Sequence, residues 1–126
     1  MNATTVSEHG RPDITIDLAR LKKNCNGNTA IVKELIAHLR EKSGPKWIAA
    51  LERAIAAGDA EDLQEICHGM KGASATVFAW RISNLALEFE YLARDGEVAL
   101  LSSRMNELLD MFEELTLWIR DYPELC

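Results

Sequence analysis

The sequence predicts an all-α fold, an antiparallel up-down four-helix bundle with additional short helices at its N-terminal end. Three observations support this prediction. Apolar residues recur at steps of three and four along most of the chain, which is the period of an amphipathic helix. Clusters of glycine, proline and asparagine interrupt that period, and no alternating strand pattern competes with it. The connections are short, which favours antiparallel neighbours.

The first 12 residues are polar and end in a proline, so we expect a flexible lead-in before a single domain over residues 13–122. A short first helix is predicted from Ile14 through Leu21. The asparagine and glycine residues of 24–28 tolerate turn conformations and should end it. Together these segments predict a small helical element that covers one end or side of the bundle.

A second helix should start near Thr29 and stop at Ser43-Gly44-Pro45, where the proline suits the first turn of a third helix. The third helix should end at Gly58, because glycine readily adopts the left-handed conformation, and Asp59 can cap the next one. A fourth helix is then predicted from about Ala60 to Val77 or Ala79.

The fifth predicted helix spans the apolar pattern from Ile82 to Ala93 and ends at Asp95-Gly96. The last helix has the most regular pattern, from Val98 to Ile119, with one stripe facing its neighbours. The core should therefore consist of four longer helices, with the short first helix and the segment from Thr29 to Lys42 covering one end or side.

Composition limits the function. The chain has 126 residues and a formal net charge of −6, so a nucleic-acid backbone or an anionic membrane surface would repel it. A protein partner is favoured. No stretch approaches the roughly 20 apolar residues of a membrane span, and the N-terminus lacks a secretory core. The three widely spaced cysteines form no C-x-x-C pair and fit reduced thiols in the cytoplasm.

His68 is the strongest candidate for a functional residue. On an ideal helix it lies about 160° from the centre of the apolar face of its segment, so its ring should point outward. An exposed neutral imidazole is a competent nucleophile toward phosphorus, because a ring nitrogen keeps a free lone pair at neutral pH.

Small and cationic residues follow the histidine. Lys71 lies one helical turn later, about 5–6 Å away between Cβ atoms, so its ammonium could reach phosphoryl oxygens. Gly72 costs about 1 kcal/mol of helix stability relative to alanine. With Ala75 and Ala79 it would leave room for another protein's backbone to approach the imidazole.

The segment around His68 resembles the signature of histidine-containing phosphotransfer domains. The matching residues are Ile66-Cys67-His68-Gly69-Met70-Lys71-Gly72-Ala73-Ser74-Ala75. The resemblance extends over residues from about 13 to 120, through the segments 16–21, 27–28, 32–39, 54–59, 85–88 and 93–96.

This resemblance implies a four-helix-bundle phosphoryl carrier without kinase activity and without a cofactor. His68 would take a phosphoryl group on Nε2 from an aspartate of one receiver domain, in a hybrid histidine kinase, and give it to a response regulator. The receiver would hold the Mg²⁺. In the family, a glutamine or glutamate 22 residues after the histidine bonds Nδ1, and Glu90 has that position here. A carboxylate there would leave Nε2 unprotonated.

Two features depart from the family. Phe78 stands where relatives usually have glycine, ten residues after the histidine. Trp80, Leu87 and Tyr91 form a second apolar stripe, which indicates burial under this chain or under a partner and would permit a dimer, although a monomer is expected. The residues expected to contact a partner are Gln64, Glu65, Gly72, Ala75, Phe78, Ala79, Trp80, Leu87 and Tyr91.

Two alternatives stay open. The fold could serve only for docking, with the stripe binding or inhibiting a kinase or receiver. An enzyme or metal site is the weaker alternative, because His9, His38 and His68 share no ligand spacing and no glycine-rich phosphate loop is present.

Overall fold

A computed structural model of the chain describes residues 15–126, and every regular element within them is helical. The predicted all-α fold is confirmed. The expected lead-in over residues 1–12 lies outside the described residues. The helices are α1 (Leu18–Asn24), α2 (Thr29–His38), α3 (Gly44–Ala57), α4 (Ala60–Thr76), α5 (Trp80–Arg94), α6 (Val98–Ser103) and α7 (Met105–Trp118).

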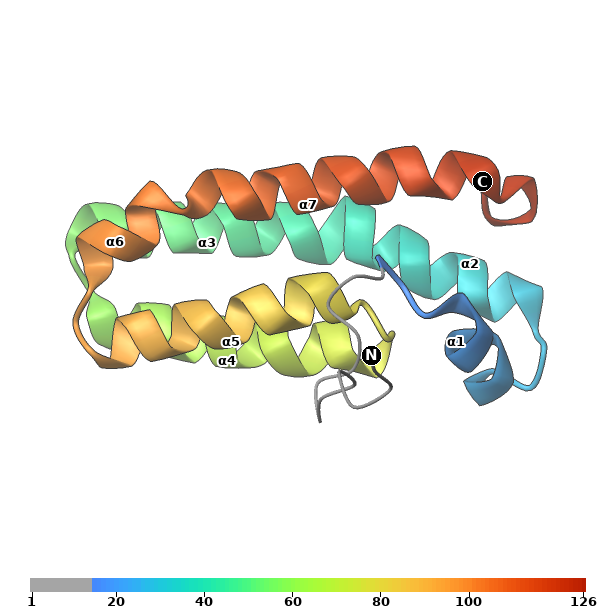
Figure 1. Ribbon diagram of the computed structural model, residues 1–126, viewed down its shortest axis with the longest axis horizontal. Coiled ribbons are helices and arrows are strands. Elements are labelled where there is room, and N and C mark those ends of the chain that lie inside the picture. Colours follow the sequence, from blue (N-terminus) through green and yellow to red (C-terminus); the bar gives the residue numbers. More distant parts are fainter. Residues whose placement is uncertain (1–14) are drawn as a thin grey trace, which may run out of the picture.

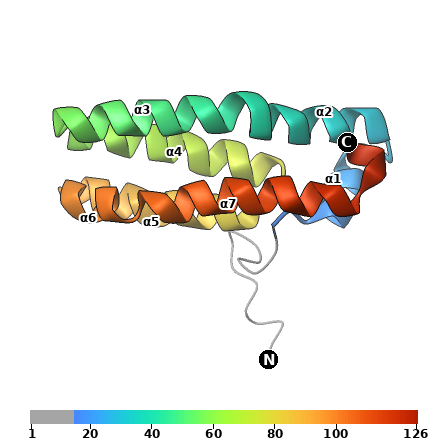
Figure 2. The ribbon, with the colours of Figure 1, turned by 90° about the horizontal axis from the view of Figure 1, so that it is seen from above.

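The long helices form two layers (Figure 1). Helices α4 and α5 lie side by side in one layer, and α3 and α7 lie in the other. Figure 2 shows that α2 continues the line of α3, while α1 and the C-terminal turns close one end. Fully buried side chains from most of the helices fill the interior, among them Leu21, Ile36, Leu51, Leu63, Met70, Phe89, Leu101, Leu108 and Leu115.

Side-chain caps set three of the helix starts. The carboxylates of Asp17 and Asp59 and the amide of Asn28 each accept a hydrogen bond from the backbone N–H three residues later, at 3.3, 3.0 and 3.1 Å. Gly58 ends α3 with a φ of 65°, as the sequence predicts. The first helix begins at Leu18, later than expected, because Asp17 caps it.

The stop predicted at Ser43-Gly44-Pro45 is wrong. The chain continues from α2 through a π-helical turn, Leu39–Ser43, into α3, and the N–H of Gly44 donates to the carbonyl of Leu39. The wider turn admits one more residue than an α-turn, and Pro45 lies in the first turn of α3, where its missing N–H leaves the helix uninterrupted. Gly44 is needed for another reason: a Cβ there would lie 2.6 Å from a ring carbon of Phe112 on α7.

The last predicted helix is divided. Arg104 has φ −104° and ψ 3°, so α6 ends at Ser103 and α7 begins at Met105. The guanidinium of Arg104 donates to Glu107 at 2.7 Å and to Glu88 of α5 at 2.9 Å. The hydrogen bond from Arg104 lowers the pKa of Glu107 despite partial desolvation. This side-chain bridge holds the junction against α5.

Phe78 ends α4 in a conformation usually given to glycine. Its φ is 57°, in the left-handed region. The N–H of Phe78 donates to the carbonyl of Ala75, and the N–H of Ala79 donates to that of Ser74, which together form a Schellman motif. The carbonyl of Phe78 accepts from the N–H of Asp17 at 2.9 Å and so joins this turn to the start of α1. The helix ending expected at Val77 or Ala79 therefore occurs at Thr76.

Candidate functional site

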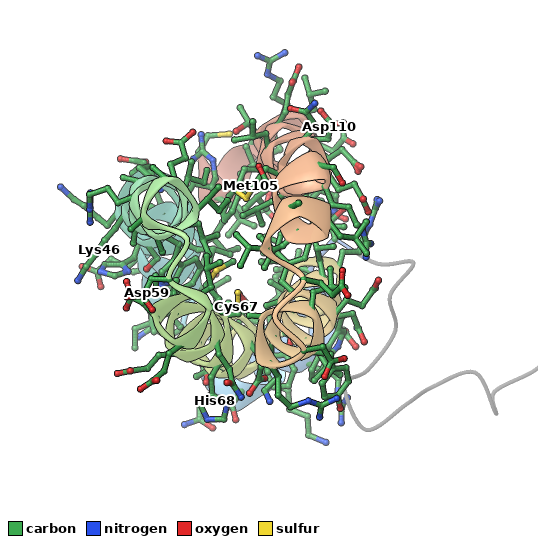
Figure 3. All side chains as sticks on the ribbon, turned by 90° about the vertical axis from the view of Figure 1, so that its left-hand side faces the viewer. Lys46, Asp59, Cys67, His68, Met105 and Asp110 are labelled. Carbon is green, nitrogen blue, oxygen red and sulfur yellow. The ribbon has the colours of Figure 1, made fainter. Side chains whose placement is uncertain are left out.

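Two consecutive residues of α4 point in opposite directions. Figure 3 shows His68 at the outer edge of the bundle and Cys67 directed toward its interior. The side chain of His68 is 69% exposed, as its helical position predicts, whereas Cys67 is fully buried. Burial, reinforced by the charge of Glu90, raises the pKa of the Cys67 thiol to about 12. The imidazole is therefore the nucleophile that solvent or a partner can reach.

Glu90 of α5 connects the two polar side chains of this site. Its Oε2 lies 2.9 Å from Nδ1 of His68, and its Oε1 accepts a hydrogen bond of 2.9 Å from Nζ of Lys71. Glu90 is only 14% exposed and Lys71 22%, so the pair is largely shielded beneath the exposed ring. The ammonium of Lys71 thus contacts Glu90 instead of extending freely into solvent.

The protonation of Glu90 decides the state of the ring. Desolvation, the largest single influence, would raise the pKa of Glu90, but hydrogen bonds from Lys71 and His68, with their charges, outweigh it and lower the pKa. Glu90 is therefore ionised at neutral pH and can only accept hydrogen bonds. Nδ1 of His68 must then carry the proton, which leaves the lone pair of a neutral ring on Nε2, the nitrogen farther from Glu90.

A second contact between the two helices fixes this geometry. Ser83 of α5 is fully buried, and its hydroxyl donates to the backbone carbonyl of Lys71 at 3.0 Å. It holds α5 in register with α4, so that Glu90, two turns further along α5, reaches both His68 and Lys71. The small size of serine allows the two helices to approach closely here.

The surface of α4 beside His68 is bare. A Cβ added at Gly69 or at Gly72 would meet no atom within 4 Å. Ala73 is exposed and Ala75 is half-buried, and the long side chain of Lys71 turns to Glu90. The clearance inferred from the sequence is present at Gly72.

The N-terminal side of His68 is a shallow acidic groove of about 320 Å³. Its lining residues are Glu61, Gln64, Glu65, His68 and Glu90. Glu61 and Glu65 are exposed, and neither has an ion-pair partner among residues 15–126. The groove therefore favours groups that bring positive charge to the ring.

Two residues expected at the partner surface are buried. Ala79 is fully buried and Trp80 is only 7% exposed, so both expectations are wrong. Trp80 begins α5, and Phe78 packs edge-on against it at 5.7 Å between ring centres. The chain itself thus covers this end of the apolar stripe. Leu87 is half-buried, and Tyr91 is 48% exposed with the guanidinium of Arg94 over its ring.

Sequence reasoning missed three residues near the site. Glu61 lies two turns before His68 on the same helix face, a spacing that could have revealed it. The sequence around Ser83 contains no motif that marks it, because its hydrogen bond to the Lys71 carbonyl depends on how α4 and α5 pack. Arg20 lies over the ring of Phe78, 5.5 Å from its centre, and depends on how α1 folds back.

Residues 15–126 contain neither a cluster of metal ligands nor a membrane-spanning helix. No group of three or more histidine, cysteine, aspartate or glutamate side chains there is arranged to hold a metal ion. Within the same residues, no helix combines the length and apolar character needed to cross a lipid bilayer.

The fold and the site together define a class of protein: a helical bundle that presents one oriented, exposed histidine on a bare helix surface. The family model of the Hpt domain matches residues 30–118, and the chain belongs to that family. Hpt domains are phosphoryl carriers of two-component phosphorelays, and they interact with receiver domains. No curated protein and no solved structure matched the chain significantly.

Proposed function

We propose that this chain carries a phosphoryl group on Nε2 of His68, between the receiver domain of a hybrid histidine kinase and that of a response regulator. The observation that carries this proposal is the 2.9 Å contact between Nδ1 of His68 and Glu90 beneath an otherwise exposed ring. It fixes the nucleophilic nitrogen and aims it outward. The compartment we propose is the cytoplasm, where thiols such as the buried Cys67 stay reduced.

The transfer is a displacement at phosphorus. The lone pair of Nε2 forms a bond to the phosphorus of an aspartyl phosphate, and the bond from phosphorus to the aspartate oxygen breaks. The aspartate leaves as a carboxylate, and the proton stays on Nδ1, which donates it in the hydrogen bond to Glu90. The reverse displacement delivers the group to the second receiver. Such a step needs alignment and charge neutralisation, and the Mg²⁺ of the receiver supplies much of the latter.

Lys71 acts through Glu90 in the unphosphorylated protein. Its ammonium balances the carboxylate charge, so the pair adds no net charge beside the incoming phosphoryl group. Once His68 is phosphorylated, the same ammonium lies within reach of a phosphoryl oxygen by side-chain rotation. The carrier has no kinase activity of its own in this proposal.

The acidic groove favours a receiver over a small anion as donor. Glu61 and Glu65 repel a bare phosphate but attract a partner that brings Mg²⁺ and basic side chains. The proposed contact surface comprises Gln64, Glu65, Gly72, Ala75, Leu87 and Tyr91. With Trp80 buried, the stripe on α5 offers less area for a dimer, and we propose a monomer.

The experiment compares three proteins with a phosphorylated receiver as donor. Wild type and His38→Gln should accept radiolabelled phosphate, whereas His68→Gln should not. His38 is a matched control, because it is an exposed histidine whose ring bonds the Ser43 hydroxyl and contacts no carboxylate among the described residues. The label should be lost in acid and kept in base. Equal labelling of His68→Gln and wild type would refute the proposal.

A further inference from the structure

A basic pocket lies at the end of the bundle where α1 meets the turn after α4. It has a volume of about 440 Å³ and is lined by Arg20, Lys23, Asn24, Asn26 and Phe78. Arg20 and Lys23 are exposed, and neither has a carboxylate partner among the described residues. Two cations and two amides thus border one aromatic ring, in a chain whose net charge is −6.

The aromatic ring of this pocket is kept at a cost. Phe78 has a φ of 57°, and for a residue with a side chain the left-handed conformation costs roughly 1–2 kcal/mol. Glycine would avoid that cost without changing the hydrogen bonds of the turn, which are all made by the backbone. The side chain of Phe78 therefore has a use that outweighs the strain.

The Phe78 ring packs against the hydrophobic core and also holds Arg20. The guanidinium lies over the ring, 5.5 Å from its centre, which is a cation–π arrangement. The ring itself is braced edge-on by the buried Trp80 at 5.7 Å. The carbonyl of Phe78 also anchors the N–H of Asp17, which caps α1. The turn thus fixes both the helix that carries Arg20 and the guanidinium itself.

The basic pocket lies on the side of the bundle that carries His68. Figure 1 places α1 just beyond the C-terminal end of α4. Figure 3, which looks along the helices, places α1 behind α4 on the side of His68. From His68 to Phe78 the chain advances about 15 Å at 1.5 Å per residue. A standard interface buries about 800 Å² per partner, a patch about 30 Å across, so one centred on His68 reaches the pocket. The bare surface at Gly72 leaves the path between them open.

We propose that this basic pocket is a second contact for the receiver and binds a carboxylate side chain on the edge of the receiver's docking surface. The inference rests on the proposed phosphotransfer function. The face around His68 is then charge-polarised, acidic at Glu61 and Glu65 and basic at Arg20 and Lys23. That polarity sets the direction in which a receiver lies along α4 and selects receivers with the complementary arrangement.

The test measures transfer from one receiver domain, phosphorylated with acetyl phosphate and chosen as the fastest donor to wild type among the receivers of the source organism. The variant is the double substitution Arg20→Gln with Lys23→Gln. Its control is Arg120→Glu, an exposed site after α7 that changes the net charge equally. We expect the KM for the receiver to rise about tenfold in the double variant, with kcat within twofold and no change in the control. Added salt should raise the KM of wild type more steeply than that of the variant.

A small phosphoryl donor that does not dock on the protein shows whether Arg20 and Lys23 contact the receiver or only support the fold. Phosphoramidate, a small phosphorus–nitrogen compound, should label His68 equally in wild type and in the double variant. A variant KM equal to that of Arg120→Glu would overturn the inference, and so would an equal loss of labelling with phosphoramidate and with receiver. If no receiver transfers to wild type, the proposed function itself fails and this inference fails with it.

Discussion

Two helical glycines of this chain have opposite surroundings. Gly44, where the π-helical turn enters α3, is buried, and an added Cβ would lie 2.6 Å from a ring carbon of Phe112. Gly72, one turn after His68 on α4, is exposed, and an added Cβ would meet nothing within 4 Å. Neither has a positive φ, so the backbone itself requires glycine at neither position.

The difference separates a glycine that the fold needs from one that we propose a partner needs. The interior explains Gly44, because α7 packs directly on it. Nothing inside the described chain explains Gly72, although it weakens α4 by about 1 kcal/mol relative to alanine. Gly72 also lies beside His68, whose Nδ1 is bonded by the carboxylate of Glu90. A glycine that the fold does not need, beside an oriented nucleophile, is the expected mark of a docking surface.

Substitution Gly44→Ala should have the largest effect on stability. The added methyl group must displace the Phe112 ring and also approaches the Leu39 carbonyl at 3.0 Å. Overpacking of this kind, less the gain in helix propensity, should lower the free energy of unfolding by about 2 kcal/mol. Urea denaturation measures it. Labelling of His68 by phosphoramidate should be unchanged in the folded variant, and a stability equal to wild type would remove the contrast with Gly72.

Substitution Gly72→Gln should act on the partner instead. Glutamine is a good helix former and meets no atom of the chain, but its side chain would stand where a receiver must approach. We expect the KM for a phosphorylated receiver to rise about tenfold, or about 1.4 kcal/mol of binding free energy. Ala99→Gln, at an exposed position on α6, is the matched control. If both variants keep the wild-type KM, the bare surface has no role in docking.

The smaller substitution Gly72→Ala should make the protein more stable. The open surroundings add no clash, so the free energy of unfolding should increase by up to about 1 kcal/mol, the usual difference in helix propensity. Thermal denaturation checks the sign, which is opposite to that at Gly44. A loss of stability would mean that α4 needs this glycine for its own packing.

Acid should weaken the contribution of Glu90. The pKa of Glu90 is lower in the folded protein than its ordinary value of 4.5. The ionised carboxylate therefore stabilises the fold above pH 4.5, and this contribution is lost as the pH falls through the lowered pKa. Glu90→Gln should thus be less stable than wild type at pH 7, by up to about 1 kcal/mol for this partly shielded pair. The gap should narrow below pH 4.5, as urea unfolding at both pH values would reveal. A gap that widens in acid would contradict the assignment.

The sequence was sufficient for most helices and for the orientation of His68, because both follow from local periodicity and caps. The position of Glu90 came from the family resemblance, and the structure shows the contact itself. The π-helical turn was missed, since a proline after a glycine is the ordinary sign of a stop. The junction at Arg104 was missed too, because its bridge to Glu88 and Glu107 depends on tertiary packing.

The apolar stripe of Trp80, Leu87 and Tyr91 shows a second limit of sequence reasoning. Periodicity showed that Trp80 belonged to an apolar face but not whether this chain or a partner covers it. The structure buries it within the chain, whereas Tyr91, three turns later on α5, stays half-exposed. At Phe78 the sequence showed an unusual residue but not its structural consequence. Its departure from glycine was visible in the sequence, but its left-handed backbone and its contact with Arg20 were not.

In the proposed mechanism, Glu90 holds the proton of His68 on Nδ1 and leaves Nε2 to take the phosphoryl group. Long-range ¹H–¹⁵N correlation spectra of the protein, recorded before and after labelling with phosphoramidate, distinguish the two ring nitrogens directly. We predict a proton on Nδ1 at neutral pH before labelling and phosphorus attached to Nε2 of His68 afterwards. Phosphorus on Nδ1, or a ring protonated on Nε2 in the unlabelled protein, would contradict this account.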